Sequence, residues 1–90
     1  LVVIASATNG IWAVENCALA AENLMLAARA AGLGSCWIGF AQSWLRTPEG
    51  KALLHLPEQS IPVAPIIIGH PSGQALPVAR KTPEIHWIGA

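Results

Sequence analysis

The sequence has few charged residues, no tyrosine and only two cysteines. Charged residues make up 11% of the 90 residues and hydrophobic residues 53%, whereas ordinary soluble domains are about 25% charged and about 45–50% apolar. Five basic residues balance five acidic ones, so the zero net charge argues against nucleic-acid binding and against a polybasic membrane anchor. So much apolar surface on so short a chain predicts that a partner covers part of it.

Long hydrophobic runs, targeting signals and metal-ligand spacings are also missing. No apolar run approaches the roughly 20 residues of a membrane span, and the apolar N-terminus lacks the basic region of a signal peptide. Cys17 and Cys36 have neither CxxC nor His-paired spacing, and His55, His70 and His86 are scattered. We therefore expect a soluble protein with no membrane span, no disulfide framework and no metal site. Two reduced thiols predict a cytoplasmic location.

The N-terminal residues predict a buried strand. Residues 1–6 are apolar and rich in β-branched side chains, and a Thr-Asn-Gly turn signal closes the run at residues 8–10. We expect a central strand here. Because Leu1 is not a methionine and no polar lead-in precedes the strand, we also expect a fragment, a processed product or a mature chain released by cleavage.

The longest predicted element is a helix over residues 11–31. This segment contains no Gly or Pro, is dominated by Ala and Leu, and is followed by Gly32 as a stop signal. Glu15, Glu22 and Arg29 recur every seven residues and form one narrow polar stripe. Since the other faces are apolar, we expect the helix to be buried against its own sheet and against another subunit, which predicts a dimer.

The remainder of the chain predicts two more strands and one more helix. Residues 35–40 form a short extended segment that ends near a glycine, and residues 47–49 (Thr-Pro-Glu) form a helix-start signature. Two prolines remove hydrogen-bond donors from residues 61–69, which limits the predicted strand to residues 66–69. The order strand, helix, strand, helix, strand indicates an α/β or α+β layered fold in one domain.

Four blocks of the sequence, in order and at matching spacing, resemble the nitroreductase family. They are residues 20–28 running into 32–39 (AAENLMLAA and GLGSCWIG), 54–58 (LHLPE), 61–71 (IPVAPIIIGHP) and 80–85 (RKTPEI). This resemblance spans nearly the whole chain. It implies the α+β nitroreductase-like fold, of which residues 1–90 form the C-terminal part of a single domain.

The resemblance implies an FMN-dependent oxidoreductase. Such proteins are intertwined homodimers that bind FMN at the subunit interface and pass hydride from NAD(P)H to nitro compounds, quinones or similar small acceptors by a ping-pong mechanism. Family members are much longer, and their N-terminal half carries an Arg-rich motif that grips the FMN phosphate. Nothing here matches that motif, so a companion chain that supplies this half is one expectation. The alternative is a non-catalytic dimerisation module.

The same resemblance places cofactor contacts on two segments. Trp37, Ile38 and Gly39 are expected at the flavin ring, because the family uses backbone groups here near N5 and Gly39 permits close approach. Arg80 and Lys81 are expected to make charge-assisted bonds to the FMN phosphate. From the residues alone, a strand end at Gly39 and a solvated basic pair remain open. No catalytic side chain is expected, since the flavin carries the redox chemistry.

Three further features complete the predictions. Trp44 is a candidate wall of the substrate pocket. His70 follows a strand-ending glycine and is a candidate neighbour of the cofactor, with a capping or surface role equally open. Residues 32–34 (Gly-Leu-Gly) follow a helix instead of opening one, so we expect neither a phosphate-binding loop nor a Rossmann domain.

Overall fold

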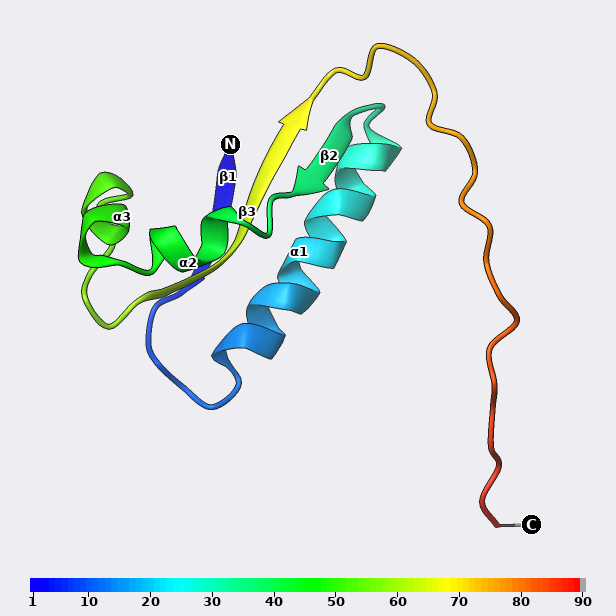
Figure 1. The fold of residues 1–90 in the computed structure, drawn as a ribbon, viewed down its shortest axis with the longest axis horizontal. Coiled ribbons are helices and arrows are strands. Elements are labelled where there is room, and N and C mark those ends of the chain that lie inside the picture. Colours follow the sequence, from blue (N-terminus) through cyan, green and yellow to red (C-terminus); the bar gives the residue numbers. More distant parts are fainter. Residues whose placement is uncertain (90) are drawn as a thin grey trace.

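The computed structural model describes residues 1–89, which form a three-stranded sheet, one long helix, two short helices and an extended C-terminal tail (Figure 1). The elements in chain order are β1 (Val2–Ser6), α1 (Ala13–Ala30), β2 (Gly34–Trp37), α2 (Ala41–Leu45), α3 (Pro48–Leu53) and β3 (Ile61–Gly69). The architecture is therefore α+β. Two short helices stand where the sequence predicts one, because Thr47 is extended and separates α2 from α3.

The sheet has the order β1-β3-β2, and both outer strands run antiparallel to β3. Ile66 in the middle of β3 pairs with Val2 on one side and Trp37 on the other. A bulge interrupts the β1 ladder between Ile4 and Ala5. The prediction of a central strand at residues 1–6 is wrong, because β3 takes the central position and β1 lies at an edge of the described sheet.

The central strand is longer than the sequence predicts. β3 runs over all of Ile61–Gly69, although Pro62 and Pro65 each lack an N–H group, and both prolines lie opposite residues of β1. On the other side β2 ends at Trp37 opposite Ile66, so the first half of β3 has no strand neighbour there. The carbonyls of Pro62, Val63 and Pro65 in this half accept hydrogen bonds from groups outside the sheet.

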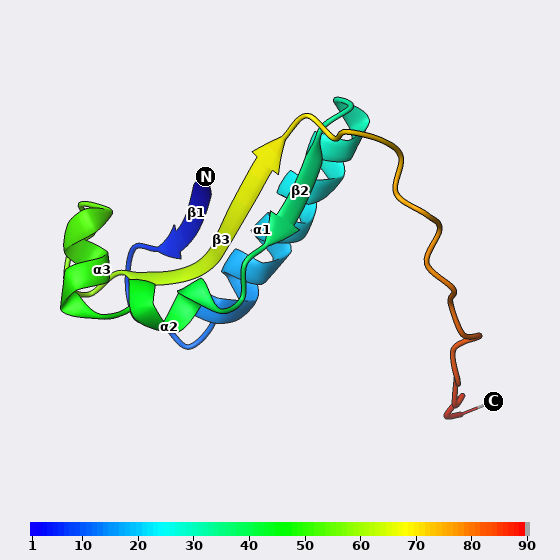
Figure 2. The same cartoon turned by 45° about the horizontal axis from the view of Figure 1, so that its top comes forward.

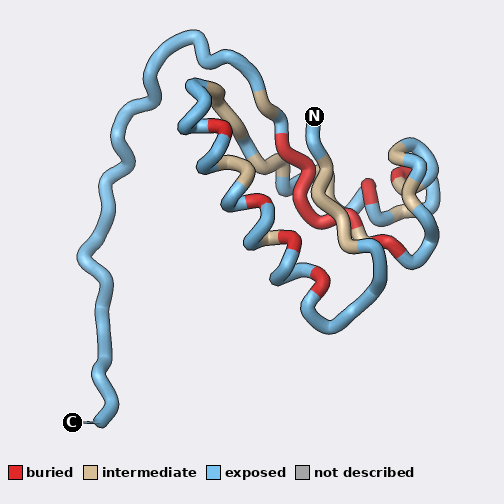
Figure 3. Tube along the Cα trace, turned by 180° about the vertical axis from the view of Figure 1, so that it is seen from behind, coloured by how far each residue is buried: buried red, intermediate tan, exposed pale blue. Residues whose placement is uncertain are grey.

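α1 covers one face of the sheet with a row of small side chains. Ala13, Cys17, Ala21 and Ala28 are its buried residues, and Figure 3 shows them along a single side of the helix. Short side chains let the helix approach β3 closely, where Ala21 packs in a buried cluster with two β3 residues. The outer face of α1 stays exposed, so the expected burial against another subunit remains a prediction.

The C-terminal end of α1 confirms the glycine stop signal. Gly32 has a φ of 79°, in the left-handed region that favours glycine. Its N–H donates to the Arg29 carbonyl at 3.0 Å, and the Leu33 N–H donates to the Ala28 carbonyl at 2.8 Å. This pair of bonds is the Schellman motif, which satisfies carbonyls that the helix leaves free and turns the chain into β2.

The tail, residues 70–89, has no helix or strand and leaves the sheet at the end of β3 (Figure 2). All of its residues are exposed, including five large apolar side chains: Leu76, Val78, Ile85, Trp87 and Ile88. Exposing large apolar groups is unfavourable in water, and the expectation that another polypeptide covers part of the apolar surface stays a prediction.

Gly50 provides a test of how tightly α3 packs on α2. A Cβ atom at this position clashes with the Trp44 carbonyl oxygen and lies 2.6 Å from the Leu45 Cα. Both are backbone atoms, so we expect Gly50→Ala to lower the free energy of unfolding by about 1–3 kcal/mol. Urea denaturation measures this. Gly10→Ala is the matched control, since no atom lies within 4 Å of its Cβ; an equal loss in both variants contradicts the prediction.

Candidate functional site

Residues 37–40 connect β2 to α2 and turn the chain out of the sheet. Trp37 ends β2 and packs against the buried cluster that contains Ala64 and Ile66. The next residue, Ile38, donates its N–H to the Pro65 carbonyl at 2.8 Å. The segment is thus held at its start by both an apolar contact and a hydrogen bond to β3.

One side chain of α2 and the side chain of the residue that follows it attach the other end of the segment to β3. Gln42 Nε2 donates to the Val63 carbonyl at 2.7 Å, and Arg46 Nε donates to the Pro62 carbonyl at 3.0 Å. These donors replace the backbone N–H groups that a neighbouring strand normally supplies. Neither residue is predicted from the sequence, because Gln42 and its acceptor are 21 residues apart and Arg46 and its acceptor are 16 residues apart. Only the fold shows that both side chains face an edge of β3.

The turn leaves two backbone donors free. The carbonyls of Ile38 and Gly39 accept from the N–H groups of Ala41 and Gln42, each at 3.2 Å. The N–H groups of Gly39 and Phe40 donate to no acceptor within residues 1–89. A Cβ placed on Gly39 meets no atom within 4 Å, so the backbone here is open to an approaching ligand. Sequence reasoning finds Gly39 and misses the free N–H of Phe40.

An open cavity of about 560 Å³ lies against this segment. It is lined by five consecutive residues: Cys36, Trp37, Ile38, Gly39 and Phe40. The predicted trio of Trp37, Ile38 and Gly39 therefore borders a single space, and the Phe40 ring beside it is fully exposed. The lining consists of apolar side chains and backbone groups, and the cavity is open to solvent.

The predicted phosphate contacts lie elsewhere. Arg80 and Lys81 are exposed residues of the tail, which runs away from residues 37–40 in both ribbon views (Figure 1, Figure 2). Within one chain the structure does not bring the two predicted groups together. Their proposed contact with a phosphate stays a prediction.

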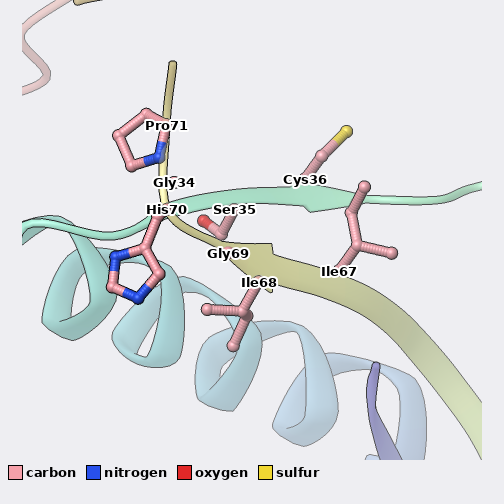
Figure 4. Close-up of a pocket in the computed structure, with 8 residues that line it drawn as sticks. All are labelled: Gly34, Ser35, Cys36, Ile67, Ile68, Gly69, His70 and Pro71. Atoms are coloured by element: carbon pink, nitrogen blue, oxygen red, sulfur yellow. The ribbon is translucent and has the colours of Figure 1, made fainter. Parts of the chain in front are cut away.

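Two other predicted residues take separate positions. Trp44 is half exposed on α2 and lines none of the described cavities. His70 lines a cavity of about 320 Å³ where β2 begins and β3 ends, together with Gly34 and Gly69. In Figure 4 its ring lies on the α1 side of the sheet, whereas Cys36 points from the opposite face.

Residues 2–70 match the model of the nitroreductase family. This chain belongs to the nitroreductase family. A protein of Methanothermobacter thermautotrophicus, provisionally named an NADH dehydrogenase/NAD(P)H nitroreductase, is 36% identical to it over 63 residues, which are 70% of this chain and 32% of the relative.

Solved structures show the same nitroreductase relationship. A Bacteroides thetaiotaomicron protein with the same provisional name has a TM-score of 0.78 and 28% identity, over 94% of this chain and 52% of that one. A nitroreductase with bound FMN from Bacteroides fragilis has a TM-score of 0.71 and 30% identity, over 91% of this chain and 45% of that one. The chain thus spans about a third to a half of the length of these nitroreductase relatives.

The thiols and histidines of this nitroreductase-family chain form no metal centre in the described part. Among residues 1–89 no three His, Cys, Asp or Glu side chains gather as ligands. Both cysteines are free, and burial raises the pKa of Cys17, while Cys36 is exposed. In the same residues, no helix has the length and apolar character that crossing a bilayer requires.

The Gln42 side chain offers a test of how α2 is anchored to β3. We expect Gln42→Leu to lower the free energy of unfolding by about 1–3 kcal/mol, because the part-buried Val63 carbonyl loses its donor. Chemical denaturation measures the loss. The control is Gln74→Leu in the exposed tail, with an expected change of about 0.5 kcal/mol or less. Equal stability of the Gln42 variant and wild type contradicts the anchoring role.

Proposed function

We propose that this chain is the C-terminal half of an FMN-dependent NAD(P)H oxidoreductase and that residues 37–40 hold the edge of the flavin ring. The observation that carries the proposal is the pair of free N–H groups at Gly39 and Phe40, beside an open apolar cavity. Membership of the nitroreductase family and the similar B. fragilis structure with bound FMN support it.

The residues of the segment fit the needs of such a ring. FMN, when bound, supplies the two-electron redox chemistry. The protein's part is to orient the ring and keep water from it. The Gly39 N–H is a donor for a ring heteroatom, and the absence of a side chain at Gly39 lets the backbone come close. Trp37 and Phe40 provide apolar surface along the same cavity.

The proposed reaction takes two electrons from NAD(P)H and delivers them to a nitro compound, a quinone or a similar small acceptor. The two half-reactions are separate, so the oxidised nicotinamide leaves before the acceptor binds. The names of the relatives support the use of NAD(P)H. Two free thiols support a cytoplasmic location.

A homodimer, or a companion chain that supplies the N-terminal half, completes the proposed site. Arg80 and Lys81 are the proposed phosphate contacts, and they lie on a tail that leaves its own sheet. Apolar side chains are exposed on that tail and on the outer face of α1, where Leu19 and Leu26 are more than half exposed. A tail that lies across a second chain brings its cations to that chain's site and covers this surface.

A non-catalytic dimerisation module is the second candidate. The observation that favours it is the apolar surface exposed on α1 and on the tail, including Leu19, Leu26 and Trp87. In this case the apolar helix and tail associate, and the segment at residues 37–40 is only a turn. FMN binding separates the two candidates.

The deciding experiment is a titration of the purified chain into FMN, followed by flavin fluorescence. We expect saturable quenching, and we expect Gly39→Val to weaken binding about tenfold, because the new side chain holds the ring away from the N–H groups. The control is Gly73→Val, in the tail, where no atom lies within 4 Å of a Cβ. Absence of quenching both by the wild-type chain alone and by the chain mixed with a polypeptide that supplies the N-terminal half favours the dimerisation module. Unchanged FMN binding by Gly39→Val contradicts the placement of the flavin ring at this segment.

A further inference from the structure

A cavity of about 430 Å³ lies between the end of α2, α3 and the loop that follows α3. We call it the α3 cavity; its lining residues are Arg46, Pro48, Lys51, Ala52, Leu56 and Glu58. It shares no residue with the cavity at residues 36–40. Figure 2 shows α2 and α3 together at one end of the sheet, away from β2.

Two cations of the α3 cavity are held in place by the backbone. Arg46 Nε donates to the Pro62 carbonyl at 3.0 Å, and Lys51 Nζ donates to the Glu58 carbonyl at 2.7 Å. Each bond uses one of the donors of its side chain, since a guanidinium carries five N–H bonds and an ammonium three. Both side chains therefore keep donors for a ligand and have already lost part of the conformational freedom that binding costs.

Neither cation is neutralised by a carboxylate. Within residues 1–89 the one ion pair joins His86 to Glu84 in the tail, so no carboxylate oxygen lies within 4.0 Å of Arg46 or Lys51. Two of the five basic residues of the chain thus line one cavity, and within residues 1–89 neither forms an ion pair. Positioned, unpaired cations are what an anion site needs.

The remaining lining residues narrow the class of ligand. Pro48, Ala52 and Leu56 form an apolar wall, which suits a ligand with an apolar body. Glu58 contributes one negative charge, so the two cations leave a net charge of about +1 in the cavity. This balance favours a monoanion over a phosphate group that carries nearly two charges.

We propose that the α3 cavity binds a small organic monoanion with an apolar body, of the short-chain carboxylate class. The carboxylate lies between the Arg46 and Lys51 side chains, and the alkyl part lies against the Pro48–Ala52–Leu56 wall. The site is independent of the proposed flavin site, because its residues and its ligand chemistry are different.

Sodium butyrate is the probe, added to the 90-residue chain at constant ionic strength and followed by amide NMR shifts. We expect saturable shifts confined to residues 46–58. We expect Lys51→Gln and Glu58→Gln to change the butyrate affinity in opposite directions. Lys51→Gln weakens binding about tenfold, because a charge-assisted bond is lost. Glu58→Gln strengthens binding roughly two- to fivefold, because a negative charge is removed from the cavity. Arg29→Gln, at the end of α1, is the matched cation control and leaves the affinity unchanged.

A variant that fills the α3 cavity distinguishes specific binding in the cavity from a general attraction of anions to the surface. Ala52 is exposed on α3, so Ala52→Leu places bulk in the cavity without removing a charge or a buried group. We expect this variant to fold as wild type and to lose butyrate binding. Shifts that do not saturate, or equal affinity in Ala52→Leu and wild type, overturn the site. Inorganic phosphate binding more tightly than butyrate overturns the monoanion assignment.

Discussion

Carbonyl groups on the first half of β3 hold the candidate site in place. Pro62 and Pro65 remove two donors from this half, and β2 ends before reaching it, so its free edge presents acceptors to the loop. Three donors from residues 38–46, one backbone and two side-chain groups, satisfy them. The chain must therefore leave the sheet at Trp37, and that exit creates the turn whose N–H groups at Gly39 and Phe40 remain free.

The same central strand also organises the apolar layer. Its α1-facing residues, Ala64 and Ile66, are fully buried under the small side chains of one helix face. Only one helix layer stands on the sheet, and much of the apolar surface of α1 and of the tail remains exposed. The composition, 53% hydrophobic, is thus higher than one such core requires. Both proposals of assembly, a second copy or a companion chain, follow from this excess.

Local signals in the sequence predict the elements well, and nonlocal contacts explain the errors. α1, its Gly32 stop and the Thr47 cap of α3, whose hydroxyl accepts from the Gly50 N–H at 3.1 Å, are confirmed because each depends on neighbouring residues. The full length and central place of β3 are missed, because the two prolines shorten the expected strand and the strand order depends on contacts between distant residues. The contact of residues 37–39 with a flavin stays a prediction, whereas the Gln42 anchor and the α3 cavity can be recognised only in the folded chain.

Residue-resolved amide hydrogen exchange, with and without FMN, tests the central claim most directly. The account predicts slow exchange at Ile38, whose N–H is bonded to β3, and fast exchange at Gly39 and Phe40 in the free chain. Addition of FMN is expected to protect Gly39 or Phe40 and to leave the exposed tail around Gly73 unchanged. The account is contradicted if saturating FMN slows exchange at neither Gly39 nor Phe40. It is also contradicted if Ile38, Gly39 and Phe40 exchange at the same rate in the free chain.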